Sequence, residues 1–383
     1  MSKKIFAIIM AAAMILACLA GCGKDKPAST TIKIGGIGPL TGDAATYGIA
    51  TKQGAEIAVA EINAKGGIQF ELNFQDDVAD GEKGVHAYNN LKDWGMQILY
   101  GCTTTGSCLA VASEAYADRY FQLTPSASST EVTAGKDNVF QMCFTDPNQG
   151  IAAADYVADH QLGTKLAVLY NNGSDYSTGI AMAFVKQAEA RGLEVVAQVT
   201  YPDDTNTDYT VQLNEAKAAG ADMMFLPIYY TPASLMLAQA KDMGYAPTFF
   251  GADGMDGILT LDGFDASLAE GLLLMTPFNA TATDERTQNF VKAYTEKYGT
   301  DTLNQFAADG YDCIYAIYEA CQKNGITAES QADEICEKLI ATFTSADFKI
   351  DGLTGTGMGW TTAGEISKTP MVVEIVNGAY VTK

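Results

Sequence analysis

The stretch MQILYGCTTTGSCLAVASEAYADRY, residues 96–120, contains one complete unit of the expected fold. Its apolar run 96–100 predicts a strand, the small residues GCTTTG predict a loop, and the alanine-rich remainder predicts a helix. Strands that alternate with helices in this way are typical of parallel sheets covered by helices on both faces. The expected fold class is therefore α/β.

The same alternation continues through most of the chain in two successive sets. The first set has expected strands at 31–38, 70–74, 96–100, 120–123 and 139–144, and helices at 51–64, at 85–94 and near Thr103 and Ser129. The second has expected strands at 165–170, 193–201, 222–229, 248–252 and 272–275, and helices at 178–191, 209–219 and 233–243. Helices at 284–298, 304–323 and 328–343 and a strand at 371–376 follow. Each set has about the size of one domain.

Two loops rich in small hydroxyl residues follow neighbouring strands of the first set. Loop 101–106 offers threonine hydroxyls and free backbone N–H groups at a helix N-terminus, which suits a carboxylate. Loop 124–130, TPSASST, follows the next strand. Ligands of open α/β sheets lie beyond the carboxyl ends of the strands, so both loops should face one crevice. Ordinary helix capping explains either loop taken alone.

The charge balance narrows the classes of partner. The chain has 383 residues, with 24 Lys plus Arg against 46 Asp plus Glu and a net charge of −22. Broad binding to nucleic acid or to an anionic membrane surface requires clustered cations, so this balance argues against both. The length fits two or three domains.

The N-terminal residues resemble an export signal of the lipoprotein type. Lys3 and Lys4 precede an uncharged apolar run, 5–19, which is short for a membrane-spanning helix. The run ends in LAGC, which resembles a bacterial lipobox and implies lipidation of Cys22. We therefore expect a lipoprotein signal peptide at 1–21 and a tether at 22–30. A plain secretory signal is the alternative.

Six cysteines remain after these assignments: Cys102, Cys108, Cys143, Cys313, Cys321 and Cys336. An exported chain permits disulfides, and Cys321 could bridge to Cys336 on the next helix. Buried free thiols fit the sequence equally well, because cysteine behaves as a small apolar residue. The sequence leaves the pairing open.

Common catalytic motifs are missing from the sequence. It contains no G-x-x-x-x-G-K-[ST] phosphate loop, no H-E-x-x-H and no G-x-S-x-G. His86 and His160 are too far apart in sequence for a zinc-binding pair. The segment 36–42 loosely resembles a dinucleotide fingerprint, but Pro39 interrupts it. We expect no enzyme activity, cofactor or metal, and an extracellular enzyme remains the least favoured alternative.

Several blocks of sequence together resemble one known family. GPLTGDAATYG (38–48) followed by AEINAKGGI (60–68) resembles the start of branched-chain amino acid binding proteins of ABC importers, the leucine/isoleucine/valine-binding type. GCTTTGSCLAVA, LTPSASSTEVT, FTDPNQG and GADGMDG match further blocks in order, over nearly the whole chain after about Thr31. The resemblance implies the type I periplasmic-binding fold, in which two Rossmann-like lobes are joined by a three-crossover hinge.

The resemblance also implies how the chain divides between the lobes. Residues 31–147 and 277–355 would form the N-terminal lobe, and 148–276 and 356–383 the C-terminal lobe. The crossovers are expected at 145–150, 276–278 and 354–359, the last of which is rich in glycine.

Candidate ligand-binding residues of the first lobe follow from the same resemblance. Thr103, beside Thr104 in its loop, stands where a hydroxyl binds the ligand carboxylate. Ala127 and Ser128, next to Ser126, stand where a backbone carbonyl and a hydroxyl meet the ammonium and the carboxylate.

The remaining candidates are aromatic or acidic. Tyr47 and Tyr176 match aromatic positions that line the cleft. Tyr229 and Asp253 match an aromatic and an acidic contact from the second lobe. The matching acid in the best-known members is glutamate, so Asp253 is one methylene shorter. A zwitterion fits this set, because hydroxyl and N–H groups suit its carboxylate and a carboxylate suits its ammonium.

The expected function is that of an extracytoplasmic receptor, anchored by lipid to the outer face of a bacterial membrane. It would capture a small amino acid, with a branched-chain aliphatic one expected, between two closing lobes. Its partners would be the permease and ATPase subunits of an ABC importer, and the receptor itself would be a monomer. A receptor of the same fold for an amide, a urea-like compound or an aromatic acid, and a sensory receptor, are the alternatives.

Overall fold

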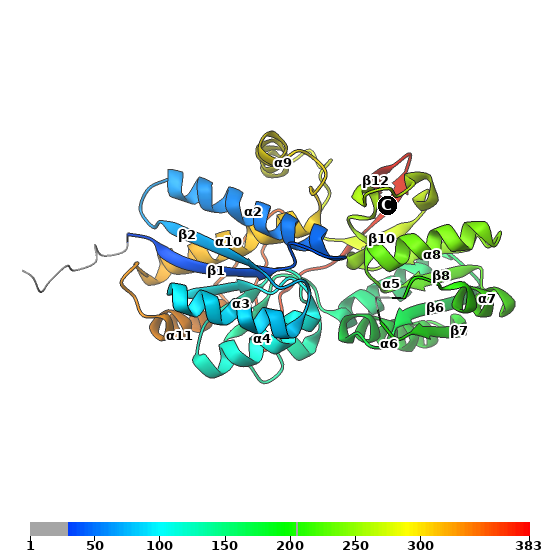
Figure 1. Ribbon diagram of the computed structural model, residues 1–383, viewed down its shortest axis with the longest axis horizontal. Coiled ribbons are helices and arrows are strands. Elements are labelled where there is room, and N and C mark those ends of the chain that lie inside the picture. The colour runs from blue at the N-terminus through cyan, green and yellow to red at the C-terminus, as the bar shows by residue number, and fades with distance from the viewer. Residues whose placement is uncertain (1–29, 204–205) are drawn as a thin grey trace, which may run out of the picture.

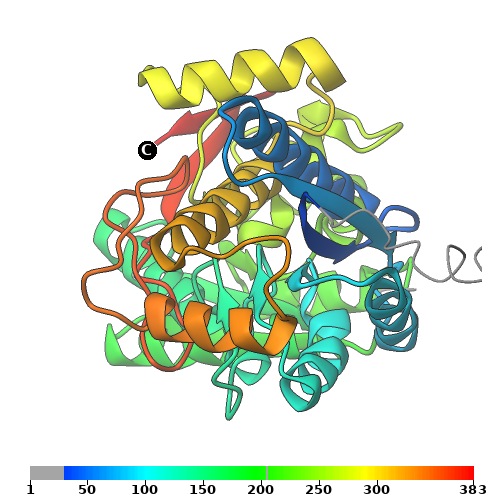
Figure 2. The ribbon, with the colours of Figure 1, turned by 90° about the vertical axis from the view of Figure 1, so that its left-hand side faces the viewer.

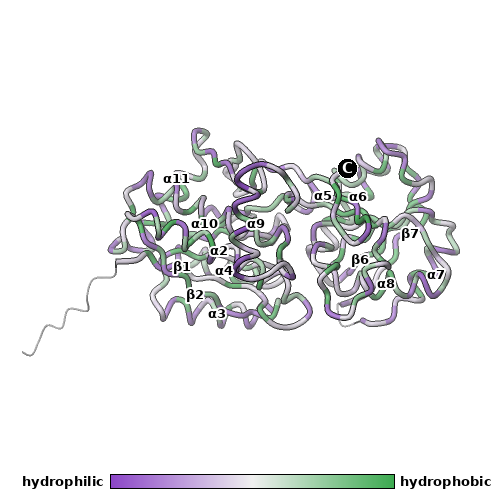
Figure 3. Tube along the Cα trace, turned by 90° about the horizontal axis from the view of Figure 1, so that it is seen from above, coloured by the Kyte–Doolittle hydropathy of each residue, from purple (hydrophilic) through white to green (hydrophobic). Residues whose placement is uncertain are grey.

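The computed structural model describes residues 30–203 and 206–383. The predicted signal peptide, Cys22 and nearly all of the tether lie outside these ranges. Within them the chain forms two α/β lobes that lie side by side along the long axis of the molecule (Figures 1 and 3). Each lobe has its own sheet, which agrees with the two sets of strands expected from the sequence.

The sheet of the first lobe is entirely parallel and has the order β2-β1-β3-β4-β5. Helices α2 and α10 cover one face together with α11, and α3 and α4 cover the other. The strands are β1 (Ile32–Gly38), β2 (Phe70–Asp76), β3 (Ile98–Gly101), β4 (Gln122–Thr124) and β5 (Val139–Gln141). The helices are α2 (Ala45–Ala64), α3 (Gly81–Trp94), α4 (Thr105–Asp118), α10 (Gln305–Asn324) and α11 (Ala332–Phe343).

The sheet of the second lobe has the order β12-β11-β10-β9-β8-β6-β7, and β11 runs antiparallel to both of its neighbours. Helices α5 and α6 cover one face, and α7 and α8 cover the other. The strands are β6 (Lys165–Asn171), β7 (Glu194–Tyr201), β8 (Met223–Leu226), β9 (Thr248–Gly251), β10 (Leu273–Thr276), β11 (Met371–Val376) and β12 (Ala379–Thr382). The helices are α5 (Asp146–His160), α6 (Asp175–Ala190), α7 (Thr210–Ala218) and α8 (Tyr230–Asp242), while α9 (Glu285–Tyr298) packs against α2.

Two local expectations differ from the structure near the end of the first set of strands. The helix expected near Ser129 is a single 3₁₀ turn, η1 (Thr130–Val132), which Ser129 caps. The first crossover, expected at 145–150, falls earlier, because α5 already begins at Asp146 and packs along α6. Pro147 in the first turn of α5 suits a helix start, since its missing N–H would have no partner there.

The third crossover was expected at 354–359, and this position is wrong. Trp360 and Ile366 belong to the core of the first lobe. The Trp360 ring lies 4.4 Å from that of Phe343, and its Nε1 donates to the backbone oxygen of Gln141 at 2.7 Å. The chain therefore crosses between Ile366 and β11. Burial of the indole outweighs the local flexibility of the glycine-rich segment, so residues 356–366 stay with the first lobe.

The six cysteines of the described ranges are buried free thiols. Bridging Cys321 to Cys336, which the sequence left open, is therefore absent from this structure. The same ranges hold no group of histidine, cysteine and acidic side chains placed to bind a metal ion. No helix in them is both long and apolar enough to cross a bilayer.

Helices α2 and α10 approach each other closely, as the view onto the first lobe shows (Figure 2). Two glycines allow this. A Cβ atom at Gly54 would lie 1.9 Å from the backbone oxygen of Ala307, and one at Gly310 would lie 2.5 Å from that of Thr51. The contact places the N-terminal ends of both helices at the junction with the second lobe.

We predict that Gly54→Ala lowers the free energy of unfolding by about 1–3 kcal/mol, because the added methyl group collides with backbone. This is opposite in sign to the gain of about 1 kcal/mol that alanine brings to an unconstrained helix. Gly106→Ala in α4 is the matched control, since nothing lies within 4 Å of its added Cβ. Thermal and urea denaturation without ligand would measure both, and equal stability of the two variants would contradict the prediction.

Candidate functional site

A small, largely enclosed space lies where the two lobes meet. Its walls come from the carboxyl ends of the first sheet, from the start of α2 and α10, and from α6, α8 and the loop after β9. The lining residues are Tyr47, Thr103, Thr104, Thr105, Ser126, Tyr176, Tyr229, Asp253, Gly254 and Phe306. Residues from seven separate segments therefore converge on one space, although the sequence places some of them about two hundred positions apart.

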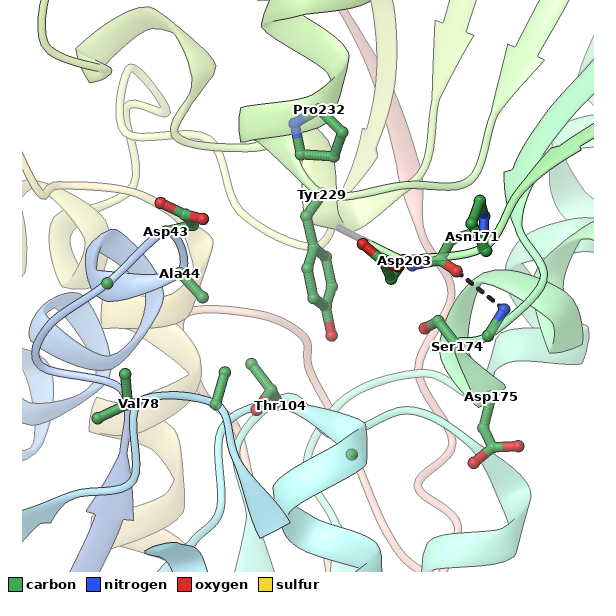
Figure 4. A pocket seen from close by; sticks show the side chains of 15 residues that line it. Asp43, Ala44, Val78, Thr104, Asn171, Ser174, Asp175, Asp203, Tyr229 and Pro232 are labelled. Carbon is green, nitrogen blue, oxygen red and sulfur yellow. Dashed lines mark hydrogen bonds between the residues drawn. The ribbon is translucent and has the colours of Figure 1, made fainter. Parts of the chain in front are cut away.

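A wider, more open cleft leads from this cavity to the surface (Figure 4). Thr104 and Tyr229 line both spaces and so mark the passage between them. In Figure 4 the Tyr229 ring points from the second lobe into the cleft. Asp43 and Val78 of the first lobe face Asn171 and Ser174 across it, among other lining residues.

The threonine loop brings hydroxyl groups and a helix N-terminus to the cavity. Thr104 caps α4 without a hydrogen bond from its side chain, and the hydroxyls of Thr104 and Thr105 are buried without a partner. The first N–H groups of any helix also lack partners within the helix. Thr103 differs, because its Oγ1 lies 3.1 Å from Oγ1 of Thr51. The loop thus offers donors for a negatively charged group at the positive end of the α4 dipole.

Asp253 contributes the acidic group of the second lobe. Its Oδ1 accepts hydrogen bonds from the Tyr176 hydroxyl at 2.7 Å and from the Gly254 N–H at 2.8 Å, and its side chain is almost fully buried. Burial raises the pKa of Asp253, and the hydrogen bond from Tyr176 opposes that rise. No lysine or arginine lines the cavity within the described residues, so a cationic group would be the favoured neighbour of this carboxylate.

Aromatic rings form the remaining walls. The Tyr47 ring packs edge-on against Tyr229, with 5.3 Å between centroids, and in a tilted arrangement against Phe306, with 4.4 Å between centroids. The Tyr47 hydroxyl donates to the backbone oxygen of Gly254 and accepts from the N–H of Tyr230 at 3.2 Å. Tyr47 belongs to the first lobe and both of its partners to the second, so this side chain joins the lobes.

Other hydrogen bonds also join the lobes beside the cavity. Gln305, the first residue of α10, donates from Nε2 to the backbone oxygen of Asp253 at 2.8 Å and from its N–H to Oδ2 of Asp256 at 3.0 Å. The Thr231 hydroxyl donates to the backbone oxygen of Asp43 at 3.0 Å. The structure therefore shows the lobes in a closed arrangement.

Seven of the nine residues expected to bind a ligand line this cavity: Tyr47, Thr103, Thr104, Ser126, Tyr176, Tyr229 and Asp253. The other two do not. Ala127 packs in the core of the first lobe, and its carbonyl accepts from Nε2 of Gln141 at 2.8 Å. Ser128 is fully buried next to α5, where its backbone oxygen accepts from the N–H of Asp146. In this arrangement neither contacts the cavity.

Sequence reasoning missed four residues at the junction: Thr105, Gly254, Gln305 and Phe306. Thr105 and Gly254 lie within sequence blocks that resemble the family, next to residues that were predicted to bind the ligand. The sequence therefore did contain a signal for these two. Gln305 and Phe306 begin a helix whose apolar pattern predicts core packing, and nothing in that pattern points to the second lobe.

This geometry, a polar cavity enclosed between two α/β lobes at the carboxyl ends of their strands, defines a protein that holds a small solute. Comparison with known proteins gives the family: the chain belongs to the periplasmic binding proteins, whose family model matches residues 31–379. This confirms the expected two-lobed fold, and it places the chain among solute-binding proteins and not among enzymes.

Individual relatives agree with that assignment. A Leu/Ile/Val-binding protein homologue of Brucella melitensis is 30% identical over 322 residues, which cover 83% of this chain and 86% of the relative. The leucine-, isoleucine-, valine-, threonine- and alanine-binding protein of Pseudomonas aeruginosa is 29% identical over 84% of this chain and 86% of its own length. A branched-chain amino acid transporter substrate-binding protein of Streptococcus pneumoniae, solved with isoleucine, is 28% identical with a TM-score of 0.81 and covers 92% of this chain and 100% of its own.

We predict that Tyr47→Phe weakens ligand binding about fivefold, since loss of its hydrogen bonds to the second lobe disfavours closure by about 1 kcal/mol. Titration calorimetry would measure the affinity, and small-angle scattering would report the more open shape. Tyr245→Phe is the control, because the Tyr245 hydroxyl donates to the backbone oxygen of Ala221 and both residues belong to the second lobe. Equal affinities for Tyr47→Phe and the unaltered protein would contradict the role of Tyr47 in closure.

Proposed function

We propose that this protein is the extracytoplasmic receptor of an ABC importer and captures an amino acid between its lobes, with a branched-chain aliphatic side chain as the preferred one. The observation that carries the proposal is the division of charge in the cavity. Hydroxyl groups and the N-terminus of α4 come from the first lobe, and the Asp253 carboxylate comes from the second. An α-amino acid presents one group of each charge, a carboxylate and an ammonium.

Binding would couple to closure through this division. The threonine loop can take up a carboxylate while the lobes are apart, whereas Asp253 reaches the ammonium only when they meet. A ligand that contacts both lobes favours the closed population by its differential affinity for that state. Closure also excludes water, which strengthens the charged hydrogen bonds inside.

The side-chain preference rests on the aromatic walls and on the relatives. Tyr47, Tyr229 and Phe306 offer apolar ring surface beside the polar groups, which suits an aliphatic side chain. The Brucella and Pseudomonas relatives are both named for leucine, isoleucine and valine, and the Pseudomonas protein also for threonine and alanine. An aromatic acid without an amino group could place its carboxylate at the threonine loop, but it would leave the buried Asp253 carboxylate without a cationic partner in the described lining.

The cellular setting of the proposal comes from the N-terminal residues. We propose that residues 1–21 are removed, that Cys22 carries the lipid anchor, and that the short tether holds a monomeric receptor at the outer face of the membrane. The permease subunits would then contact the closed form, and the ATPase subunits would act from the other side of the membrane.

Calorimetric titration with the twenty amino acids tests the function directly. We expect L-leucine, L-isoleucine and L-valine to bind, and N-acetyl-L-leucine to bind at least about thirtyfold more weakly, because it lacks the ammonium group. Asp253→Asn should weaken the binding of L-leucine by a similar factor. Asp242→Asn, at the exposed end of α8, should leave the affinity for L-leucine unchanged. Failure of all twenty amino acids to bind the folded protein would refute the proposal.

The anchor has its own test. Cys22→Ser should leave the protein unlipidated and move it from the membrane fraction to the soluble exported fraction of a bacterial host. Mass spectrometry of the N-terminal peptide would show an acylated cysteine at position 22 in the unaltered protein. An unmodified cysteine there, with the protein still exported, would indicate a plain secretory signal instead.

A further inference from the structure

A buried ion pair lies where the chain crosses between the lobes for the third time. Nζ of Lys368 lies 2.8 Å from Oδ1 of Asp309 on α10, and the two side chains are 1% and 3% exposed. Removing two charges from water is costly, and apolar residues of similar volume often stabilise such a position equally well. The pair is therefore explained better by the arrangement that it fixes than by the stability that it adds.

A second aspartate of α10 holds the other end of the same segment. Asp312, one helical turn further along, is buried and accepts hydrogen bonds from the N–H groups of Leu353 and Thr354 at 2.8 and 2.9 Å. It also accepts from the Thr354 hydroxyl at 2.6 Å. Residues 353–368 are thus attached to α10 at both ends. The glycine-rich part of this segment is consequently fixed to the first lobe on both sides.

The two residues that follow the buried pair join the lobes. Before them, the N–H of Ser367 donates to the backbone oxygen of Gly359 at 2.8 Å, within the first lobe. Thr369 is exposed and Pro370 carries no N–H group, and β11 of the second sheet begins directly afterwards. Thr369 and Pro370 therefore separate the last residue attached to the first lobe from the first residue of the second sheet.

The same stretch of α10 also contacts the loop that carries the acidic group of the cavity. Gln305, one turn before Asp309, donates to the backbone oxygen of Asp253 at 2.8 Å. Lys368 is the positive charge that acts on Asp309, and Asp253 is among the negative ones. A displacement of the crossover along α10 would therefore change how the first lobe meets Asp253.

We infer that the Asp309–Lys368 pair fixes the position of the hinge, because it keeps the third crossover attached to α10 in both the open and the closed form. The change in backbone angles is then confined to Thr369 and Pro370, as hinges in proteins use only a few residues. Both members of the pair belong to the first lobe, so rotation of the second lobe leaves the pair intact. The inference concerns the motion of the lobes and does not depend on which ligand binds.

Replacing the pair by apolar residues provides the first test. Asp309→Leu combined with Lys368→Met should leave the urea midpoint of unfolding nearly unchanged. Lys368→Met alone should lower that midpoint, because the carboxylate stays buried without its cation. The double variant should have a larger radius of gyration without ligand in small-angle scattering, and should bind L-leucine about fivefold more weakly. The loss of affinity follows from a hinge that closes less accurately.

The exposed pair of Glu334 and Lys338 on α11, replaced by leucine and methionine in the same way, is the matched control. It should leave the scattering and the affinity unchanged. A stable double variant at Asp309 and Lys368 with the scattering and affinity of the unaltered protein would show a purely structural pair and would overturn the inference.

Two substitutions outside the buried pair locate the hinge independently. Pro370→Gly frees the φ angle at the crossover. Gly357→Asn restricts the glycine-rich segment instead, at an exposed position where an added Cβ meets nothing within 4 Å and where asparagine tolerates the φ of +60°. We expect Pro370→Gly to increase the radius of gyration of the ligand-free protein, and Gly357→Asn to leave it unchanged.

Unchanged scattering for Pro370→Gly, or an equal change in both variants, would overturn the inference. These measurements need no ligand. If no amino acid bound the folded protein, the proposed function would fail while the position of the hinge would still be tested.

Discussion

Holding a carboxylate out of water at the junction of two lobes is the constraint on which the rest of this structure depends. Asp253 is buried, and its Oδ1 accepts hydrogen bonds from two neutral groups, the Tyr176 hydroxyl and the backbone N–H of Gly254. Such a group is satisfied best by a cation. The cavity lining of the described chain offers none, so the closed protein is electrostatically incomplete without a ligand. A bound zwitterion can therefore determine whether the two lobes are open or closed.

The hydrogen bonds described between the lobes join mostly neutral groups. Tyr47, Gln305 and Thr231 form hydrogen bonds between side chain and backbone or carboxylate across the junction. Each such bond contributes about 1 kcal/mol, which is small enough for the open and closed forms to remain in exchange. Bound ligand then shifts the equilibrium between the open and closed forms toward the closed form.

The two sheets place these groups correctly because of their topology. Parallel strands present their carboxyl ends at one edge, so the loops after β3, β4 and β9 meet at the same junction. Close packing of α2 on α10 at Gly54 and Gly310 then brings Tyr47 and Phe306 together beside them. The site is thus a product of both lobes, and neither sheet could form it alone.

The sequence by itself determined the local units of this protein and the kinds of chemistry it carries. Alternating apolar runs and helical patterns act over short distances, so strands such as 165–170 and the threonine loop before α4 could be predicted from neighbouring residues. The resemblance of ordered blocks added seven of the residues that line the cavity. Only the tertiary structure decided where the chain changes lobe and that Ala127 faces the core. These outcomes depend on packing between segments that are remote in sequence, such as the contact of Trp360 with Phe343 in the first lobe. No local sequence pattern contains that information.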